Sequence, residues 1–267
     1  MITPLAAAAV LAAGSVTVPV PQVMAALGDS ITSGFNACGW YVSCPSRSWA
    51  AGDEAGIRSH FTRLGMRSGN LNFAQPGATS ADLRRQVGQA VKAGAEYVTI
   101  LMGANDVCAG TEKTMTPVEV FGRRVEQALG ELKEGLPQAR VFVATIPDLR
   151  RLWQAGKDSA IARTFWTLGR ICRPMLAAPG SKARKDAQRR ARVRERVIDY
   201  NQALERACAG YGPNCRSDGG AVFSFPYTLD HISKWDFFHP NAAGQRAVAE
   251  QTFKHGFDWS PVFQPNS

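Results

Sequence analysis

The chain is predicted to be an α/β protein, in which a doubly wound, mostly parallel sheet lies between helices in three α/β/α layers. The first observation behind this prediction is that short apolar runs alternate with helix-like segments along most of the chain. Such alternation predicts parallel strands that are joined by helices on both faces of a sheet. The second is size: 267 residues, of which 45% are hydrophobic, suit one large α/β domain with a substantial core.

Short apolar segments bounded by turn residues are predicted as strands. The run from Tyr97 to Met102 is the most strongly apolar, which is typical of a central strand buried on both faces. The first strand ends at Gly28, where a turn is expected. The predicted strands comprise residues 23–27, 71–74, 97–102, 140–146 and 221–225.

The segments between these strands carry helix signals. Ser80 is predicted to be the N-cap of one helix. Thr116-Pro117-Val118-Glu119 is interpreted as a capping box with proline at the first helical position of another. Residues 149–208 are predicted to be helical and irregular by turns, with breaks at Pro174 and at Pro179-Gly180. Other helices are predicted at residues 46–64, 80–94, 117–136 and 241–253.

The N-terminus resembles an export signal. No charged residue precedes Asp29, and residues 2–13 form an alanine-rich apolar stretch that is followed by small residues and prolines. This length suits the apolar core of a signal peptide and is too short for a membrane span. A basic segment before it is lacking, so the signal is atypical or truncated; a buried N-terminal arm is the alternative. We therefore expect residues 1–21 to be a signal-like segment and arm, residues 22–267 a single domain, and the protein to be secreted.

The six cysteines are an even number, which in an exported chain predicts disulfide bonds. Short spacings favour pairing Cys38 with Cys44 and Cys208 with Cys215, which leaves Cys108 to pair with Cys172. A zinc site is the competing interpretation. It is disfavoured because no CxxC spacing occurs and the histidines do not cluster with the cysteines.

Three residues that suit acyl-transfer chemistry each follow a predicted strand. Ser30, Gly77 and Asn105 come within a few residues of strand ends, and the carboxyl ends of parallel strands meet at one edge of a sheet. Ser30 can supply a nucleophilic hydroxyl. The N–H groups of Ser30 and Gly77 and the amide of Asn105 can donate to an oxyanion. Each residue alone also has an ordinary role, as a helix cap or a turn residue.

Asp236 and His239 form the second half of a possible catalytic set. A carboxylate three residues from an imidazole can orient the ring and stabilise its protonated form. The alternative is a turn-capping aspartate beside a histidine in a polar surface loop. Pro240 and Asn241 follow, and they are expected to hold this loop and begin the last helix.

Taken together, four segments in this order resemble the SGNH, or GDSL, hydrolase family, over about residues 22–255. The resemblance implies a flavodoxin-like fold, Ser30 as nucleophile with Asp236 and His239 completing the triad, and Ser30, Gly77 and Asn105 as the oxyanion hole. It implies neither a metal nor an organic cofactor. The segments are Gly28-Asp29-Ser30-Ile31-Thr32, Gln75-Pro76-Gly77-Ala78-Thr79, Gly103-Ala104-Asn105-Asp106 and Asp236-Phe237-Phe238-His239-Pro240.

A finer similarity is to the phospholipase B-like branch of that family. It rests on Ala25-Ala26-Leu27-Gly28-Asp29-Ser30, Ser46-Arg47-Ser48-Trp49 and Gly103-Ala104-Asn105-Asp106-Val107-Cys108. It implies a small-molecule or lipid ester substrate of the lipase or phospholipase type. A carbohydrate O-deacetylase and a non-catalytic lipid- or glycan-binding module are the alternatives.

The chain is basic, with a formal net charge of +9 and a pI of about 9.5. Eight of the basic residues lie in residues 182–196. This segment is predicted to be a solvated surface helix, and transient contact with an anionic membrane is the alternative. Nucleic-acid binding is not expected, since aromatic residues are not interleaved with these charges. The protein is expected to be a monomer.

Overall fold

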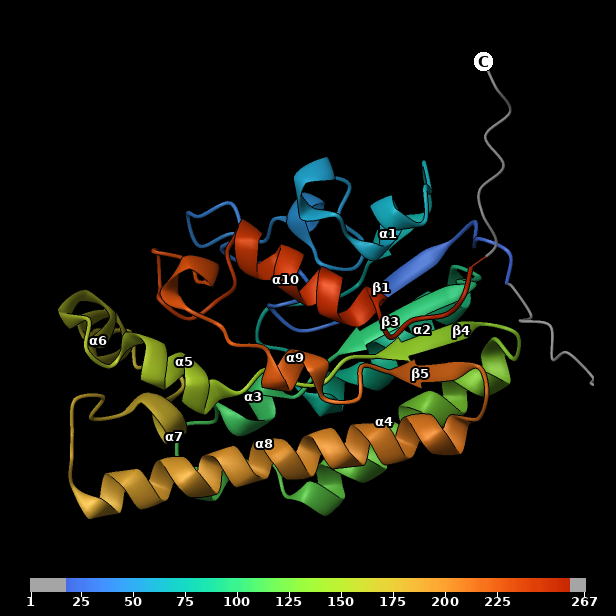
Figure 1. The fold of residues 1–267 in the computed structure, drawn as a ribbon. Coiled ribbons are helices and arrows are strands. Elements are labelled where there is room, and N and C mark those ends of the chain that lie inside the picture. The colour runs from blue at the N-terminus through green and yellow to red at the C-terminus, as the bar shows by residue number, and fades with distance from the viewer. Residues whose placement is uncertain (1–17, 260–267) are drawn as a thin grey trace, which may run out of the picture.

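The computed structural model describes residues 18–259 of the chain (Figure 1). Most of the predicted signal-like segment therefore lies outside the described residues. Among the helices that are described, none has the length and apolarity needed to cross a membrane.

The centre of the fold is a five-stranded, wholly parallel sheet in the order β2-β1-β3-β4-β5, which confirms the predicted α/β class. The order reverses direction at β1, as in doubly wound flavodoxin-like sheets, and ligands of such sheets bind beyond the carboxyl ends of the strands. The strands are β1 (Met24–Gly28), β2 (Asn70–Asn72), β3 (Tyr97–Leu101), β4 (Arg140–Val143) and β5 (Cys215–Ser217).

Helices cover both faces of the sheet, so the three predicted layers are present (Figure 1). Alternate strand residues supply the two cores: Ala25 and Leu27 pack with one set of helices, Met24 and Ala26 with the other. One face carries α2 (Leu83–Lys92), α4 (Val118–Gly135) and α8 (Arg184–Tyr211). The other carries α1 (His60–Arg63), α9 (Ala221–Ser224) and α10 (Ala242–Phe253).

The remaining helices follow the carboxyl ends of β3 and β4 and precede α8. They are α3 (Ala104–Val107), α5 (Leu149–Gly156), α6 (Ala160–Leu168) and α7 (Arg173–Leu176). The predicted break at Pro179-Gly180 lies between α7 and α8, whereas Pro174 is the second residue of α7, in its first turn, instead of interrupting a helix. Residues 182–196 lie mainly in the first half of α8.

Two predicted elements are wrong. Residues 46–64 do not form one helix but two 3₁₀ turns, Pro45–Arg47 and Ala55–Ile57, followed by α1. Backbone groups of this segment bond to distant partners instead of to one another: the Trp49 N–H donates to Gln245 Oε1 at 2.9 Å. The predicted inward residues Trp49, Ile57, Phe61 and Leu64 are nevertheless buried.

The second wrong element is the strand at residues 221–225, which is helix α9. Asp218 makes this turn helical because its side chain accepts the Val222 N–H at 2.7 Å and its carbonyl accepts the Ala221 N–H at 3.1 Å. The fifth strand, β5, lies just before it. Strand β5 is short and polar, so it lacks the apolar run that marks the buried strands.

Two predicted helix caps also differ. Thr79, not Ser80, is the N-cap of the 3₁₀ turn Ser80–Asp82 that leads into α2, and it forms a capping box with Asp82. The Ser80 N–H and hydroxyl instead donate to Asp106 at 2.8 and 2.6 Å. At α4, Pro117 is the N-cap and no side chain caps the helix, so Thr116 does not form the predicted capping box.

The three predicted disulfides are present: Cys38–Cys44, Cys108–Cys172 and Cys208–Cys215. The first clamps a loop after β1, and the third joins α8 to β5. The second crosses 64 residues of sequence and ties the end of α3 to the start of α7. It therefore holds two segments at the carboxyl edge of the sheet.

Candidate active site

Ser30 lies in the turn that follows β1, at the carboxyl edge of the sheet. The turn depends on Gly28, which has a φ of 149° and whose missing Cβ leaves room for the Leu101 carbonyl and the Thr32 side chain. Buried Gln86 fixes this glycine from both sides: it accepts the Gly28 N–H at 2.7 Å and donates to the Gly28 carbonyl at 2.9 Å. The serine is thus presented from a rigid backbone.

The structure brings Ser30, His239 and Asp236 into one hydrogen-bonded row, although 209 positions separate the first two. His239 Nε2 lies 2.9 Å from Ser30 Oγ, and His239 Nδ1 lies 2.6 Å from Asp236 Oδ2. The other oxygen of Asp236 accepts the N–H groups of Phe238 at 2.8 Å and His239 at 3.0 Å. The turn that carries the two residues is therefore folded around the carboxylate.

Electrostatics favour a charged Asp236. Burial alone would raise the pKa of this carboxyl group, but hydrogen bonds from the His239 side chain and backbone, with the nearby imidazole charge, hold the pKa below its ordinary value. Asp29 behaves differently. Burial raises the pKa of Asp29 to about 6, although the Ile31 N–H and the His239 charge act in the opposite direction. Asp236 is thus kept ionised, whereas the pKa of Asp29 lies only about one unit below neutral pH.

Asn36 is a residue of this site that the sequence analysis missed. It is buried, and its Nδ2 donates to Asp236 Oδ2, the same oxygen that faces His239 Nδ1. Its Oδ1 accepts the Tyr41 N–H at 2.8 Å, which fixes the orientation of the amide. Its φ of 61° lies in the left-handed region, where asparagine is among the few residues commonly found. An asparagine in a glycine-rich loop reads as a turn residue, and only the fold shows its distant partner.

The three predicted oxyanion donors are placed differently with respect to the site. Asn105 lines the same pocket as Ser30 and His239, in α3 directly after β3. One hydrogen of its Nδ2 donates to the Ala78 carbonyl at 2.9 Å, which leaves the second hydrogen available. Gly77 is exposed, has a φ of 82° and is not among the residues that line the pocket.

Gly77 is nevertheless tied to the site through its neighbours. Ala78 accepts the bond from Asn105, and Ser80 bonds to Asp106 in α3. Among the described residues, the backbone N–H groups of Ser30 and Gly77 have no acceptor. Both remain free to bind a ligand oxygen.

The row of hydrogen bonds opens into a small, largely apolar pocket of about 40 Å³. Asp148 is the acidic residue of the pocket wall, and its carboxylate already has protein partners: it accepts a hydrogen bond from Arg194 Nε at 2.8 Å and caps α5. No group of acidic, histidine or cysteine residues within 18–259 is arranged to hold a metal ion. The apolar lining comprises Ile31, Ala104, Pro147, Leu149, Leu152, Tyr227, Ile232, Phe238 and Pro240.

Comparison with known proteins places the chain in a family. Residues 24–252 match the family model described as GDSL-like lipase/acylhydrolase. The chain is similar to the human protein "Phospholipase B1, membrane-associated", with 27% identity over 177 residues. That match covers 53% of this chain and spans only 12% of the length of the human protein.

Three solved structures share the fold. The phospholipase A1 of Streptomyces albidoflavus matches with a TM-score of 0.52 and 20% identity, over 88% of this chain and 98% of that one. A psychrotrophic esterase of Pseudoalteromonas sp. matches with a TM-score of 0.51 and 13% identity, over 88% and 96%. A family two carbohydrate esterase of Clostridium thermocellum matches with a TM-score of 0.51 and 15% identity, over 87% and 62%. The family match over residues 24–252 makes the chain a member of the GDSL-like lipase/acylhydrolase family.

Proposed function

We propose that the protein is a secreted serine hydrolase that cleaves lipid esters through an acyl-enzyme intermediate. The observation that carries this proposal is the continuous row from Asp236 through His239 to Ser30 at the wall of an apolar pocket. A nucleophile that touches a base, and a base that touches an orienting carboxylate, is the arrangement that activates a serine hydroxyl.

The reaction begins when Ser30 Oγ attacks the ester carbonyl carbon and its proton passes to His239 Nε2. The carbonyl π electrons move onto oxygen, and the oxyanion accepts from the N–H groups of Ser30 and Gly77 and from the Asn105 amide. The tetrahedral intermediate collapses, the C–O bond to the alcohol breaks, and the alcohol leaves with the proton from His239. Ionised Asp236 stabilises the imidazolium at each stage.

Water completes the cycle. His239 Nε2 removes a proton from water as its oxygen attacks the acyl carbon, a second oxyanion forms at the same donors, and Ser30 leaves with the proton. The carboxylic acid product is released and the hydrogen-bonded row is restored. Every proton that His239 accepts is returned within the cycle.

Lipid substrates are supported by the wall of the pocket. Its side chains beside Ser30 are aliphatic and aromatic, and they can bury an acyl chain by the hydrophobic effect. The similarity to a protein named as a phospholipase points to the same class. Secretion is supported by the three disulfides, since these bonds persist in oxidising compartments.

The test is hydrolysis of p-nitrophenyl esters from acetate to palmitate, and of phosphatidylcholine, by the oxidised protein and its Ser30→Ala variant. Ser224→Ala, a substitution of an exposed serine in α9, is the matched control. We expect turnover that depends on Ser30 and rises with acyl length beyond acetate. Turnover confined to acetyl esters would instead indicate an O-deacetylase. Equal rates for the protein and Ser30→Ala would refute the mechanism and favour a binding module.

A further inference from the structure

Large apolar side chains are exposed around the segment that carries Asp236 and His239. Trp40 is 74% exposed, and Tyr41, Val42 and Trp235 are also exposed. On α6, Ile161 and Leu168 are exposed, the latter by 79%, and Phe165 is half-buried. We call these seven residues the apical surface. Within residues 18–259 every exposed large apolar side chain belongs to it, so apolar exposure is concentrated here.

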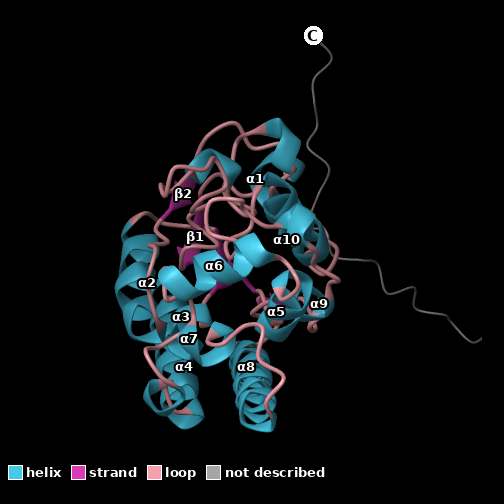
Figure 2. Ribbon diagram, turned by 90° about the vertical axis from the view of Figure 1, so that its left-hand side faces the viewer, coloured by secondary structure: helices cyan, strands magenta, loops and turns pink. Residues whose placement is uncertain are grey.

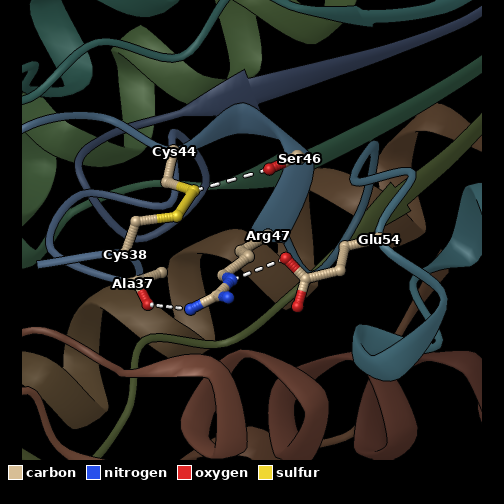
Figure 3. The surroundings of a disulfide bond; sticks show 6 residues. All are labelled: Ala37, Cys38, Cys44, Ser46, Arg47 and Glu54. Carbon is tan, nitrogen blue, oxygen red and sulfur yellow. Dashed lines mark hydrogen bonds and ion pairs between the residues drawn. A yellow bond between two sulfur atoms is a disulfide. The ribbon is translucent and has the colours of Figure 1, made fainter.

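The first part of the apical surface is a rigid loop. The Cys38–Cys44 disulfide closes it, and Arg47 braces its base by donating to the Ala37 carbonyl at 3.0 Å and to Glu54 at 2.6 Å (Figure 3). At its tip, Trp40 and Tyr41 have φ values of 63° and 54°. Bulky residues in the left-handed region carry a conformational cost. The loop therefore holds two aromatic side chains in solvent at the expense of stability.

The second part is one face of α6. Ile161, Phe165 and Leu168 follow the spacing i, i+4, i+7 and so form a stripe along the helix. The adjacent face is buried through Ala162 and Trp166. The helix thus has a second apolar face, on which Ile161 and Leu168 are exposed and Phe165 is half-buried. Figure 2 shows α6 at the front of the molecule, across the end of the sheet.

The two parts are joined through the segment that carries the triad residues. Trp40 lies against Trp235 with ring centroids 4.5 Å apart, and Phe165 lies against Phe237 at 5.3 Å. Asp236 lies between Trp235 and Phe237 in the sequence, and the next residue, Phe238, lines the pocket. The apical surface therefore adjoins the active site and the pocket, at the end of the molecule where α6 lies (Figure 1).

Charge around the apical surface is mainly positive. Residues 149–173, which include α5 and α6, contain six basic residues and one acidic residue, Asp158. Arg170 and Arg173 follow the apolar stripe directly, and both are exposed, as is Lys234 beside Trp235. Like charges would oppose pairing of this face with a second copy of the chain, whereas an anionic surface would attract it.

We propose that the apical surface docks onto anionic lipid assemblies and presents the pocket to lipid esters within them. The chemistry fits each part: tryptophan and tyrosine suit the boundary between headgroups and acyl chains, the α6 stripe supplies further apolar area, and the arginines meet lipid phosphates. This proposal rests on the lipid-ester function proposed above. It is distinct from a membrane role for residues 182–196, because it places the contact at the pocket mouth.

The test measures vesicle binding without catalysis, in the Ser30→Ala background. Binding is measured by co-sedimentation with phosphatidylcholine vesicles that contain or lack phosphatidylglycerol. Three proteins are compared: the Ser30→Ala protein, the same protein with Trp40→Ser and Leu168→Ser, and the same protein with Arg170→Gln and Arg173→Gln. Met66→Ser is the matched control, since Met66 is a half-buried apolar residue in the turn before β2. We expect the apolar pair to weaken binding about tenfold or more on both vesicles. The arginine pair should weaken binding only where phosphatidylglycerol is present.

The same substitutions in the active protein separate this proposal from the function on which it rests. Hydrolysis of a soluble short-chain ester should persist in the Trp40→Ser, Leu168→Ser protein, while hydrolysis of vesicle lipid falls. Absence of Ser30-dependent hydrolysis would sink the proposed function and leave the binding result standing. Unchanged vesicle binding by the apolar pair would overturn the docking proposal. A change of oligomeric state in that pair, seen by sedimentation, would assign the surface to a second copy and overturn it equally.

Discussion

Asn36 and His239 bond to the same carboxylate oxygen, Oδ2 of Asp236. The imidazole is therefore not the only group that orients this oxygen. With the Phe238 and His239 N–H groups on Oδ1, the carboxylate receives four hydrogen bonds in a buried setting, which fixes its rotation as well as its charge. In the mechanism proposed above, Asn36 acts through Asp236, as a positioning residue.

Replacing Asn36 with glycine removes the amide and keeps the positive φ accessible, so the loop is not strained. We expect kcat to fall about 10- to 100-fold with little change in KM, because a misplaced carboxylate misorients His239. Without the Asn36 donor, more of the Asp236 charge acts on the imidazole, so the acid limb of the kcat/KM profile, where the base takes up a proton, should move to higher pH. Asn70→Ala, which deletes a bond to the Ala51 carbonyl, is the control. An unaltered pH profile would mean that Asn36 only stabilises the loop.

Asn105→Ala tests the side-chain oxyanion donor. Loss of one such donor costs about 10²- to 10³-fold in kcat in enzymes of this chemistry, and we expect a loss of that order with KM nearly unchanged. The bond to the Ala78 carbonyl is also lost, which should cost about 1 kcal/mol of stability. Asn105→Asp keeps the shape and sets a carboxylate against the oxyanion, so its kcat should be lower still. Steady-state kinetics with denaturant unfolding separates the two effects.

The Cys108–Cys172 disulfide is expected to carry much of the stability at the carboxyl edge. For a sequence separation of 64, the loop-entropy model gives about 4 kcal/mol. We therefore expect Cys108→Ala with Cys172→Ala to unfold at a clearly lower urea concentration. The pair Cys208→Ala with Cys215→Ala, whose separation is 7, should lose less by the same model. Equal losses from the two pairs would show that loop closure does not govern this fold.

Much of the fold and the site could be predicted from sequence because their signals are local. The strands β1, β3 and β4 are buried on both faces and so appear as apolar runs, and Ser30 and Asn105 directly follow two of them. The cysteine pairing followed from spacing alone. Edge strand β5 was missed because a polar strand of three residues has no such run.

The parts that could not be predicted depend on distant partners. Residues 46–64 have helical spacing of apolar groups, but Gln245 and the core draw their backbone out of a helix. Asn36 looks like any turn asparagine until the fold brings Asp236 to it across 200 residues. Tertiary hydrogen bonds of this kind leave no trace in local composition.

His60 provides a test of the buried polar core behind the site. Its Nδ1 lies 2.7 Å from the Tyr97 hydroxyl and its Nε2 lies 2.7 Å from Thr252 Oγ1, which itself donates to the Val248 carbonyl. Thr252 therefore accepts from Nε2–H, and Tyr97 donates to Nδ1. A proton on Nδ1 would set two donors against each other in a site closed to water.

The stability of the protein should consequently depend on His60 in acid. Burial, with a smaller contribution from the charge of Arg63, lowers the pKa of His60 from 6.5 to about 3. Between these two pKa values the unfolded chain binds a proton at His60 and the folded chain does not. The contribution of His60 to the free energy of unfolding is therefore fully present above about pH 6.5, and it falls by up to about 1.4 kcal/mol per pH unit down to about pH 3. The raised pKa of Asp29 makes a contribution to stability that increases as the pH falls below about 6, opposite in sign to that of His60. Asp29 is present in both the protein and the His60 variant, so its contribution cancels in the difference between their free energies of unfolding. Urea unfolding of the protein and of its His60→Gln variant across this pH range should show that the free energy of unfolding changes less with pH in the variant. This holds whatever the stability of the variant at neutral pH. Parallel curves would mean that the ring is protonated in the fold and that Tyr97 has turned to accept from it.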